Sequence, residues 1–255
     1  MIERVGIIGV GHLASYLVEG VRRASRDIEI VLSPRNTERA ASLAARFGAV
    51  VATDNQAVAG ASDLILLTTR PGDAVAACEG VAFRPGQTVV SVAAGLPLGT
   101  LKPAAAPATV IRAMPISCAA INHSPTLLYP DHPQARGLFT LLGQVHVLPD
   151  ESRFTPASVI AAFYGWVYAL LHETVAWTTS AGVPPQTARN LVLETVRGAA
   201  DMALARPDQD LDAMLDSLAT PGGITEHGLT LLRRRGGLTA WREALDAVLS
   251  RLRSD

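Results

Sequence analysis

A glycine-rich turn follows the first apolar run of the chain, and it restricts the possible folds more than any other feature. The run Arg4–Ile8 predicts a β-strand, and the turn after it, Gly9-Val10-Gly11-His12-Leu13-Ala14, has the spacing G-x-G-x-x-A. The first glycine of such a turn permits a tight bend, the second lets the backbone approach a pyrophosphate, and the small third residue permits close packing of a helix on the strand. The start of that helix attracts phosphate through its free N–H groups.

The elements after the turn have the spacing of one βαβ unit. Apolar periodicity predicts a helix over residues 13–24, and the run IEIVL predicts a second strand over residues 28–32. In this context the turn indicates a dinucleotide-binding Rossmann domain rather than a glycine turn of some other α/β fold. The residues expected around the pyrophosphate are Gly9, Gly11, His12, Leu13 and Ala14.

The end of the second strand indicates which dinucleotide is bound. An NAD site usually has Asp or Glu there, about 20 residues beyond the turn, to bind the ribose hydroxyls. This chain instead has Ser33-Pro34-Arg35-Asn36-Thr37, which contains no carboxylate. Ser33, Arg35 and Thr37 could hydrogen-bond or pair with a 2′-phosphate, so the sequence favours NADPH over NADH. The alternative is that Arg35 is simply a solvated arginine at the start of a helix.

Short apolar runs alternate with helical patterns as far as residue 150, which is typical of parallel strands joined by crossover helices. Further strands are expected over residues 49–52, 63–68, 87–92, 109–113, 125–129 and 144–148, and helices over residues 38–47, 72–78 and 133–142. Beyond Pro149 helical periodicity dominates, with helices expected over residues 158–181, 185–205, 211–219, 225–234 and 238–253. The expected fold is α/β: a Rossmann doubly wound parallel sheet over residues 1–150, followed by an all-α domain over residues 151–255.

Residues 155–171 carry no charge and include the run AFYGWVYALL, which raises the question of a membrane anchor. A spanning helix needs about 20 strongly apolar residues, and this segment is shorter and contains Pro156, Ser158 and Gly165. We therefore expect a buried helix and no membrane partner. The apolar length of the helical domain exceeds what one small bundle can bury, which predicts a homodimer or a higher homo-oligomer built by these helices.

Composition bounds the remaining partners and the compartment. A formal net charge of −1 favours neither nucleic acid nor an anionic membrane. Cys78 and Cys118 form no C-x-x-C pair, and the start of the chain lacks the apolar segment of a signal peptide, so a cytoplasmic protein is expected. The six histidines and two cysteines show no metal-ligand spacing, so no metal is expected.

Several short motifs, in order along the chain, resemble those of the pyrroline-5-carboxylate reductase family. The family's Lys-Pro after the fourth strand is similar to Arg70-Pro71, and its S-x-A-A-G run matches Ser91-Val92-Ala93-Ala94-Gly95. Its R-x-M-P-N segment is close to Arg112-Ala113-Met114-Pro115-Ile116, and its S-P-G-G-x-T signature is similar to Thr220-Pro221-Gly222-Gly223-Ile224-Thr225. That family reduces a cyclic imine to proline with NAD(P)H, on a Rossmann domain followed by a helical dimerisation domain.

The resemblance implies a set of further site residues. Those expected at the cofactor are Thr69, Arg70, Pro71, Ala93, Ala94, Met114 and Pro115. Thr220 and Thr225 are expected to supply hydroxyl donors beside the substrate, while Gly222 and Gly223 bind it through the backbone and allow the unusual dihedral angles of such a loop. The alternative for this segment is a simple helix–helix turn with a threonine N-cap.

The chain departs from the family where the long helix of the second domain begins. The family has roughly G-S-G-P-A-Y there, whereas this chain has Phe163-Tyr164-Gly165-Trp166-Val167-Tyr168, and Ile116 replaces the asparagine after Met-Pro. In the family these segments lie near the nicotinamide and the substrate carboxylate. We therefore expect an imine reductase with an altered, more apolar or differently shaped pocket, formed in part by Gly165 and Tyr168.

Hydride transfer to a C=N bond requires a positioned nicotinamide and a proton donor for the nitrogen. Tyr164 is the candidate donor, since a phenol can hydrogen-bond a substrate while its ring stays apolar. Phe163, Trp166 and Leu170 are interpreted as core or dimer contacts. Two other functions stay open: a reductase of a carbonyl or of another cofactor such as a deazaflavin, and a non-catalytic NADP-binding protein.

Overall fold

The computed structural model describes residues 2–254 and divides into two compact units. The first unit comprises the chain up to Ser158 together with its end from Arg251, and the second comprises Val159–Ser250. The sequence-based boundary near residue 150 therefore precedes this division by one short helical stretch, made of η4 (Glu151–Arg153) and α6 (Phe154–Ser158).

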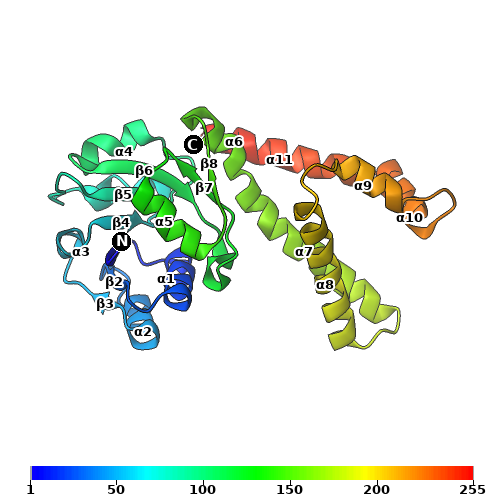
Figure 1. Ribbon diagram of the computed structural model, residues 1–255, viewed down its shortest axis with the longest axis horizontal. Helices are drawn as coiled ribbons and strands as arrows, with labels where there is room; N and C mark the ends of the chain where they lie inside the picture. The colour runs from blue at the N-terminus through cyan, green and yellow to red at the C-terminus, as the bar shows by residue number, and fades with distance from the viewer. Residues whose placement is uncertain (1, 255) are drawn as a thin grey trace. The chain divides into compact units, whose positions relative to one another are not determined.

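The first unit is an eight-stranded sheet with the strand order β3-β2-β1-β4-β5-β6-β7-β8 (Figure 1). Its strands are β1 (Arg4–Ile8), β2 (Glu29–Leu32), β3 (Val50–Val51), β4 (Leu64–Leu67), β5 (Thr88–Ser91), β6 (Thr109–Met114), β7 (Thr126–Tyr129) and β8 (Val145–Val147). Its helices are α1 (His12–Ala24), α2 (Thr37–Phe47), α3 (Asn55–Ala61), α4 (Leu98–Ala105) and α5 (Pro133–Leu142), besides α6. The predicted α/β fold with a doubly wound sheet is confirmed.

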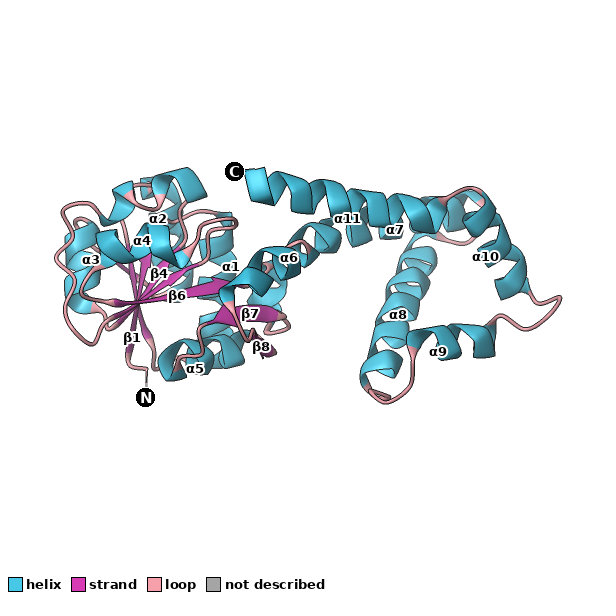
Figure 2. Cartoon of the chain, turned by 90° about the horizontal axis from the view of Figure 1, so that it is seen from above, coloured by secondary structure: helices cyan, strands magenta, loops and turns pink. Residues whose placement is uncertain are grey.

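Helices cover both faces of the sheet, as Figure 2 shows from above. Val5 and Ile7 belong to the core shared with α1, α2 and α5, whereas Ile8 belongs to the core shared with α3 and α4. This division follows from the period of two along a strand, and burial on both faces explains why β1, β4 and β5 appear in the sequence as nearly unbroken apolar runs.

One strand pair is antiparallel, which the predicted parallel sheet did not include. Strand β6 ends at Met114, a 3₁₀ turn η3 (Ser117–Ile121) follows, and β7 returns antiparallel to β6, with Ala113 opposite Leu128. A parallel pair of strands needs a crossover connection, usually a helix, that carries the chain back to the other end of the sheet. The connection between β6 and β7 contains no such helix, so β7 starts at the end of the sheet where β6 stops and runs in the opposite direction.

Two other differences concern local structure. The helix expected over residues 72–78 is instead two 3₁₀ turns, η1 (Pro71–Asp73) and η2 (Ala76–Cys78). Short helices were expected between the strands, but the bounds of α3 and α4 were not predicted. Helix α4 contains Pro103 and Gly99, which are poor helix formers, whereas α3 does carry a recognisable start because Asp54 caps it by accepting from Ala57 N at 2.7 Å.

The second unit consists of helices α7 (Ile160–Ser180), α8 (Pro185–Leu204), α9 (Leu211–Leu218), α10 (Ile224–Arg234) and most of α11 (Gly237–Ser254). Helices α7 and α8 pack against each other, and Trp241 of α11 contacts Phe163 and Trp166 of α7. The predicted helix bounds agree with the structure to within two residues at each end.

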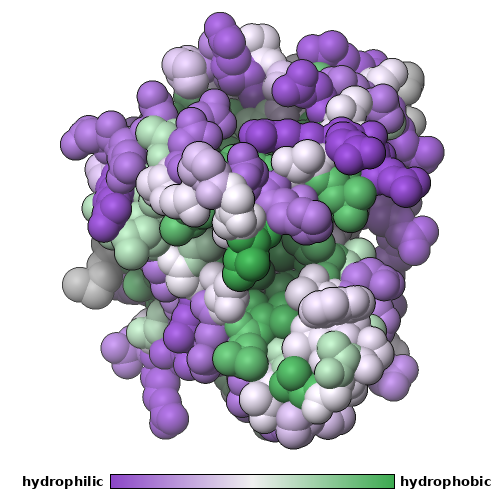
Figure 3. All heavy atoms as spheres, turned by 90° about the vertical axis from the view of Figure 1, so that its right-hand side faces the viewer, coloured by the Kyte–Doolittle hydropathy of each residue, from purple (hydrophilic) through white to green (hydrophobic). Residues whose placement is uncertain are grey.

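The expectation that the AFYGWVYALL helix is buried is wrong for the single chain. No residue of α7, α9 or α10 is buried, and in α8 only Ala188 and Val192 are. Apolar side chains consequently reach the surface, as the green atoms in Figure 3 show for one side of the molecule. By length and composition the helical stretch Glu151–Ser180 could cross a membrane, and 17% of its apolar window is buried.

Helix α1 approaches η3 so closely that one position tolerates only glycine. A Cβ atom at Gly20 would lie 2.1 Å from the carbonyl oxygen of Ala119, which is backbone and cannot rotate away. The side-chain amide of Asn122 also donates to Gly20 O at 2.9 Å. The position of β7 therefore depends on the absence of a side chain in the middle of α1.

We expect Gly20→Ala to lower the free energy of unfolding by about 1–3 kcal/mol or more, because the methyl group forces α1 away from η3. Gly60→Ala in α3 is the matched control: nothing lies within 4 Å of a Cβ there, so a gain of about 0.5 kcal/mol is expected from the better helix propensity. Urea unfolding measures both. Equal stability changes in the two variants would contradict the close approach.

Candidate functional site

The glycine turn adopts the backbone conformation that a phosphate cradle requires. Gly9 has φ +97°, and a Cβ atom there would lie 2.6 Å from the Cγ2 atom of Thr69. A Cβ at Gly11, in contrast, would meet nothing within 4 Å, so the turn is open on that side. Gly11 is also the N-cap residue of α1 and provides no side-chain cap, which leaves the first N–H groups of the helix available to an anion.

Two side-chain hydroxyl groups form hydrogen bonds with the backbone of the glycine turn. The Ser33 hydroxyl accepts from Gly9 N at 3.0 Å, and the Thr68 hydroxyl donates to Gly9 O at 2.5 Å. Ser33 is 1% exposed, so its hydroxyl supports the turn inside the fold. The contact of Ser33 with the 2′-phosphate stays a prediction, and support of the turn is a further role of this hydroxyl. The role of Thr68 was not predicted, since a threonine at the end of a strand carries no distinguishing pattern.

Arg35, which is expected at the adenosine end, lines an open cavity at the carboxyl end of β2. Pro34 and Arg35 line this cavity of about 450 Å³ together with the start of α3 and residues 79–81. Arg35 is exposed and available to an anionic group. Sequence reasoning missed Arg39, whose Nη2 lies 3.2 Å from His12 Nε2, so that a second guanidinium reaches the glycine turn from α2.

The other expected cofactor residues follow the strands next to β1 in the sheet. Thr69, Arg70 and Pro71 come after β4, Ala93 and Ala94 after β5, and Pro115 follows Met114 at the end of β6. Because β1, β4, β5 and β6 are parallel neighbours, these residues share the carboxyl edge of the sheet with the glycine turn. The Thr69 hydroxyl is buried there without a hydrogen-bond partner among the described residues, a polar atom that suits a bound ligand.

The side chains expected at the substrate lie on the second unit. On α7 the hydroxyl oxygens of Tyr164 and Tyr168 are 3.0 Å apart, and their rings pack edge to face with centroids 5.3 Å apart. Gly165 lies between them, and nothing would meet a Cβ there within 4 Å. Phe163 and Trp166 contact Trp241, in agreement with their interpretation as packing residues.

The Pro-Gly-Gly segment forms a tight turn between α9 and α10. Gly222 has φ +75°, its N–H donates to Glu226 Oε2 at 2.7 Å, and Gly223 N donates to Thr220 O at 2.8 Å. Gly223, rather than a threonine, is the N-cap residue of α10, so the alternative of a threonine N-cap is wrong. Thr220 and Thr225 are both exposed.

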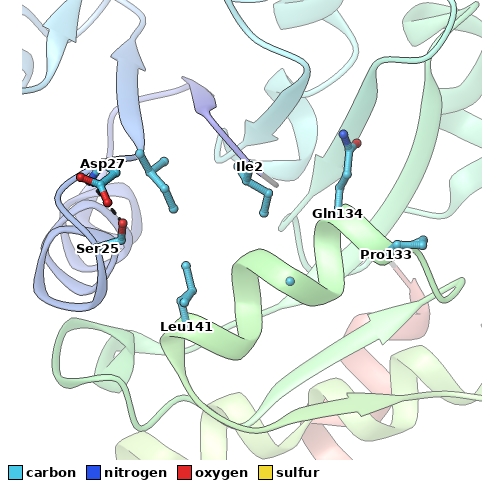
Figure 4. Close-up of a pocket in the computed structure, with 8 residues that line it drawn as sticks. Ile2, Ser25, Asp27, Pro133, Gln134 and Leu141 are labelled. Carbon is cyan, nitrogen blue, oxygen red and sulfur yellow. Dashed lines mark hydrogen bonds between the residues drawn. The ribbon is translucent and has the colours of Figure 1, made fainter.

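A second cavity of about 450 Å³ lies at the opposite edge of the sheet, near the amino ends of β1 and β2 (Figure 4). It is mostly apolar, lined by Ile2, Ile28 and Leu141 among others, and Asp27 is its one charged lining residue. The glycine turn lies at the carboxyl edge of the sheet, so a cavity at the opposite edge is a poor candidate for the cofactor site.

Among the described residues, neither metal chemistry nor a reactive thiol at Cys78 is indicated. They contain no group of three or more His, Cys, Asp or Glu side chains that could hold a metal ion. Burial raises the pKa of the Cys78 thiol to about 11, so this group stays protonated and unreactive near neutral pH.

Two family models match the chain. Residues 151–254 match "Pyrroline-5-carboxylate reductase dimerisation", and residues 4–95 match "NADP oxidoreductase coenzyme F420-dependent". The second match confirms the prediction of NADP as the cofactor at the level of the family.

Curated relatives match over nearly the whole length. A pyrroline-5-carboxylate reductase of Pseudomonas aeruginosa is 26% identical over 97% of this chain and 95% of that protein. One of Mycobacterium leprae is 28% identical over 99% of this chain and 96% of that protein.

Solved structures show the same fold. A pyrroline-5-carboxylate reductase of Streptococcus pyogenes has a TM-score of 0.87 and 24% identity, covering 99% of this chain and 98% of that one. The pyrroline carboxylate reductase of Plasmodium falciparum, solved with NADP bound, has a TM-score of 0.88 and 19% identity, covering 100% of this chain and 99% of that one. With its motifs in order, its glycine turn and these similarities, the chain is similar to pyrroline-5-carboxylate reductases along nearly its whole length.

Proposed function

We propose that the protein is an NADPH-dependent reductase of a cyclic imine, with a substrate pocket altered from that of its relatives. The observation that carries the proposal is the open glycine turn at Gly11, on a chain that is similar to pyrroline-5-carboxylate reductases along nearly its whole length. Such an enzyme adds a hydride to the imine carbon and a proton to the nitrogen, which yields a cyclic secondary amine.

The first unit has the groups that an NADPH molecule needs. The backbone of Gly9 and Gly11 and the start of α1 fit a pyrophosphate, while Arg35 and Arg39 offer positive charge on the side where a 2′-phosphate would bind. The bound cofactor supplies the hydride. The small residues Ala93 and Ala94 allow a flat ring to approach the backbone at the end of β5.

The tyrosine pair of α7 offers the proton. A tyrosine hydroxyl that accepts a hydrogen bond from its neighbour can donate its own proton to a substrate nitrogen. We assign this donation to Tyr164, which is half-buried, and give Tyr168, which is more exposed, the role of orienting it. Thr220 and Thr225 are proposed as further donors to the substrate, beside the backbone of Gly222 and Gly223.

The same helix supports the altered pocket. Where relatives of this family have a small residue and a proline, this chain has Tyr164 and Trp166, and Trp166 packs near Trp241. Large aromatic rings reduce the space near the substrate and make its surroundings less polar. We therefore propose a cyclic imine that is more apolar, or differently shaped, than pyrroline-5-carboxylate.

We further propose a cytoplasmic homodimer or higher homo-oligomer assembled through the second unit. Trp166, Leu170 and Trp241 line a groove of about 430 Å³ on that unit, and its wall is almost entirely apolar. A soluble monomer rarely exposes so much contiguous apolar surface, and the matched family model for these residues is a dimerisation model. A second copy of the chain is therefore the occupant that we propose for the groove.

Removal of the arginine after β2 tests the cofactor assignment. Arg35→Ala should weaken NADP⁺ binding about tenfold, a loss of roughly 1.4 kcal/mol, and leave NAD⁺ binding nearly unchanged, because only NADP⁺ carries the 2′-phosphate. Isothermal titration calorimetry measures both constants, with Arg23→Ala at the exposed end of α1 as the control. Equal weakening of both dinucleotides would contradict the assignment.

Conservative substitutions test the proton donor. Tyr164→Phe should lower kcat for a cyclic imine by about 10²-fold with little change in KM for NADPH, while Tyr168→Phe should have a smaller effect. The assay follows NADPH oxidation with a panel of cyclic imines. Turnover of ketones or of a deazaflavin alone would favour the carbonyl or other-cofactor reductase, and NADPH binding without any turnover would favour a non-catalytic protein.

A charge placed in the apolar groove tests the assembly. Leu170→Glu should shift the protein from dimer to monomer in sedimentation experiments, because a carboxylate cannot be buried there without a partner. Val50→Glu on β3 is a matched control, since the two side chains are 50% and 49% exposed. A wild-type monomer that floats with phospholipid vesicles would instead indicate that the apolar helices meet a membrane.

A further inference from the structure

A buried arginine near the end of β6 depends on one carboxylate. Arg112 is 3% exposed, and its Nη1 donates to Glu151 Oε1 at 3.0 Å. Its guanidinium also stacks on Phe154, with 4.2 Å between Cζ and the ring centroid. Among the described residues, no hydrogen-bond partner is found for Nε and Nη2 of Arg112. Burial lowers the pKa of Arg112 and Glu151 opposes this effect, so the ion pair keeps a desolvated cation inside the fold.

The same carboxylate oxygen also caps a helix. Glu151 Oε1 accepts from the backbone N–H of Leu98 at 2.7 Å. Leu98 is the first residue of α4, and the N-cap residue Pro97 contributes no side-chain hydrogen bond. A carboxylate at a helix N-terminus satisfies a free N–H group and interacts favourably with the helix dipole. Glu151 therefore provides, from far along the chain, the cap that α4 lacks locally.

These two bonds connect Glu151 to β6 and to the far end of the loop that follows β5. Residues 92–97 join the end of β5 to Leu98 and include Ala93, Ala94 and Gly95, and the last of these has φ +75°. Glu151 fixes the far end of this loop through Leu98, and through Arg112 it contacts β6 two residues before Met114. All of these residues belong to the first unit.

The strand order indicates which half of the dinucleotide would lie near the loop that Glu151 contacts. A dinucleotide lies across the crevice where the strand order reverses, with its two halves on opposite sides of β1. Arg35 follows β2 on one side, and the loop after β5 lies on the other. The adenosine 2′-phosphate and the nicotinamide therefore meet different sets of strands, and the side-chain bonds of Glu151 to described residues belong to the second set.

We propose that Glu151 is a positioning residue for the nicotinamide half of the cofactor: its carboxylate, bonded at once to Arg112 and to the start of α4, sets the loop of residues 92–97. This inference rests on the proposed NADPH-dependent function. Loss of Glu151 releases the loop at its far end and leaves Arg112 without its acceptor, while the glycine turn and Arg39 of α2 keep their contacts.

The proposal is tested by comparing the binding of the complete cofactor with the binding of its adenosine half alone. Calorimetry compares NADPH with adenosine 2′,5′-bisphosphate, which lacks the nicotinamide half. Glu151→Ala should weaken NADPH binding about tenfold and change binding of the bisphosphate less than about twofold. Glu151→Gln should have a smaller effect, because its amide oxygen still accepts from Leu98 N. The control is Asp150→Asn, whose carboxylate bonds only to Ser152 and Arg153 among the described residues.

Each outcome decides the matter. Unchanged NADPH binding in Glu151→Ala would overturn the inference, and so would equal weakening of both ligands, which would indicate a general loss of structure. If Glu151→Ala does not fold, Glu151→Gln is judged by the same comparison, supported by faster hydrogen exchange in residues 92–96. A wild-type protein that binds neither ligand would overturn the proposed function itself, whereas a wild type that binds both isolates the role of Glu151.

Discussion

The hydrogen bonds that hold the backbone of Gly9 are the constraint on which the cofactor half of the structure depends. Ser33 and Thr68, from the ends of two strands that flank β1, bond the N–H and the carbonyl of the same residue. Gly9 can accept this crowding because it has no side chain and takes a positive φ. The bonds direct the open side of the turn, at Gly11, away from the core, where the start of α1 can bind an anion.

Few contacts also hold the start of the helical stretch, at Glu151 and Phe154. The first unit is closed around two apolar cores, and Glu151 and Phe154 attach the start of that stretch to β6 and α4. Beyond Val159 the helices bury almost nothing within the chain, although they are as apolar as core helices. Exposed apolar surface of this extent is unfavourable in water, which supports the proposal that another surface covers the second unit.

Much of the fold could be predicted from local patterns, whereas the long-range contacts that hold the site residues in place could not. The strand runs, the helices of the second unit and the glycine turn each have a period or a spacing that shows in a short window. Arg39 at His12, Thr68 at Gly9 and Glu151 at Leu98 have no such pattern, because each pair is brought together by elements far apart in the chain. The antiparallel return of β7 was missed for the same reason, since strand direction depends on how the connection packs.

The sequence by itself determined the Rossmann unit, the order of its elements, the helical second half and the family motifs. It did so because apolar periodicity and glycine spacing act over a few residues and leave a direct trace in the chain. Only the tertiary structure decided that Ser33 supports the turn, that Glu151 caps α4, and that the AFYGWVYALL helix stays exposed in one chain. Burial and hydrogen-bond partners depend on which residues pack nearby in three dimensions. An apolar sequence does not show whether it packs against its own chain or against another surface.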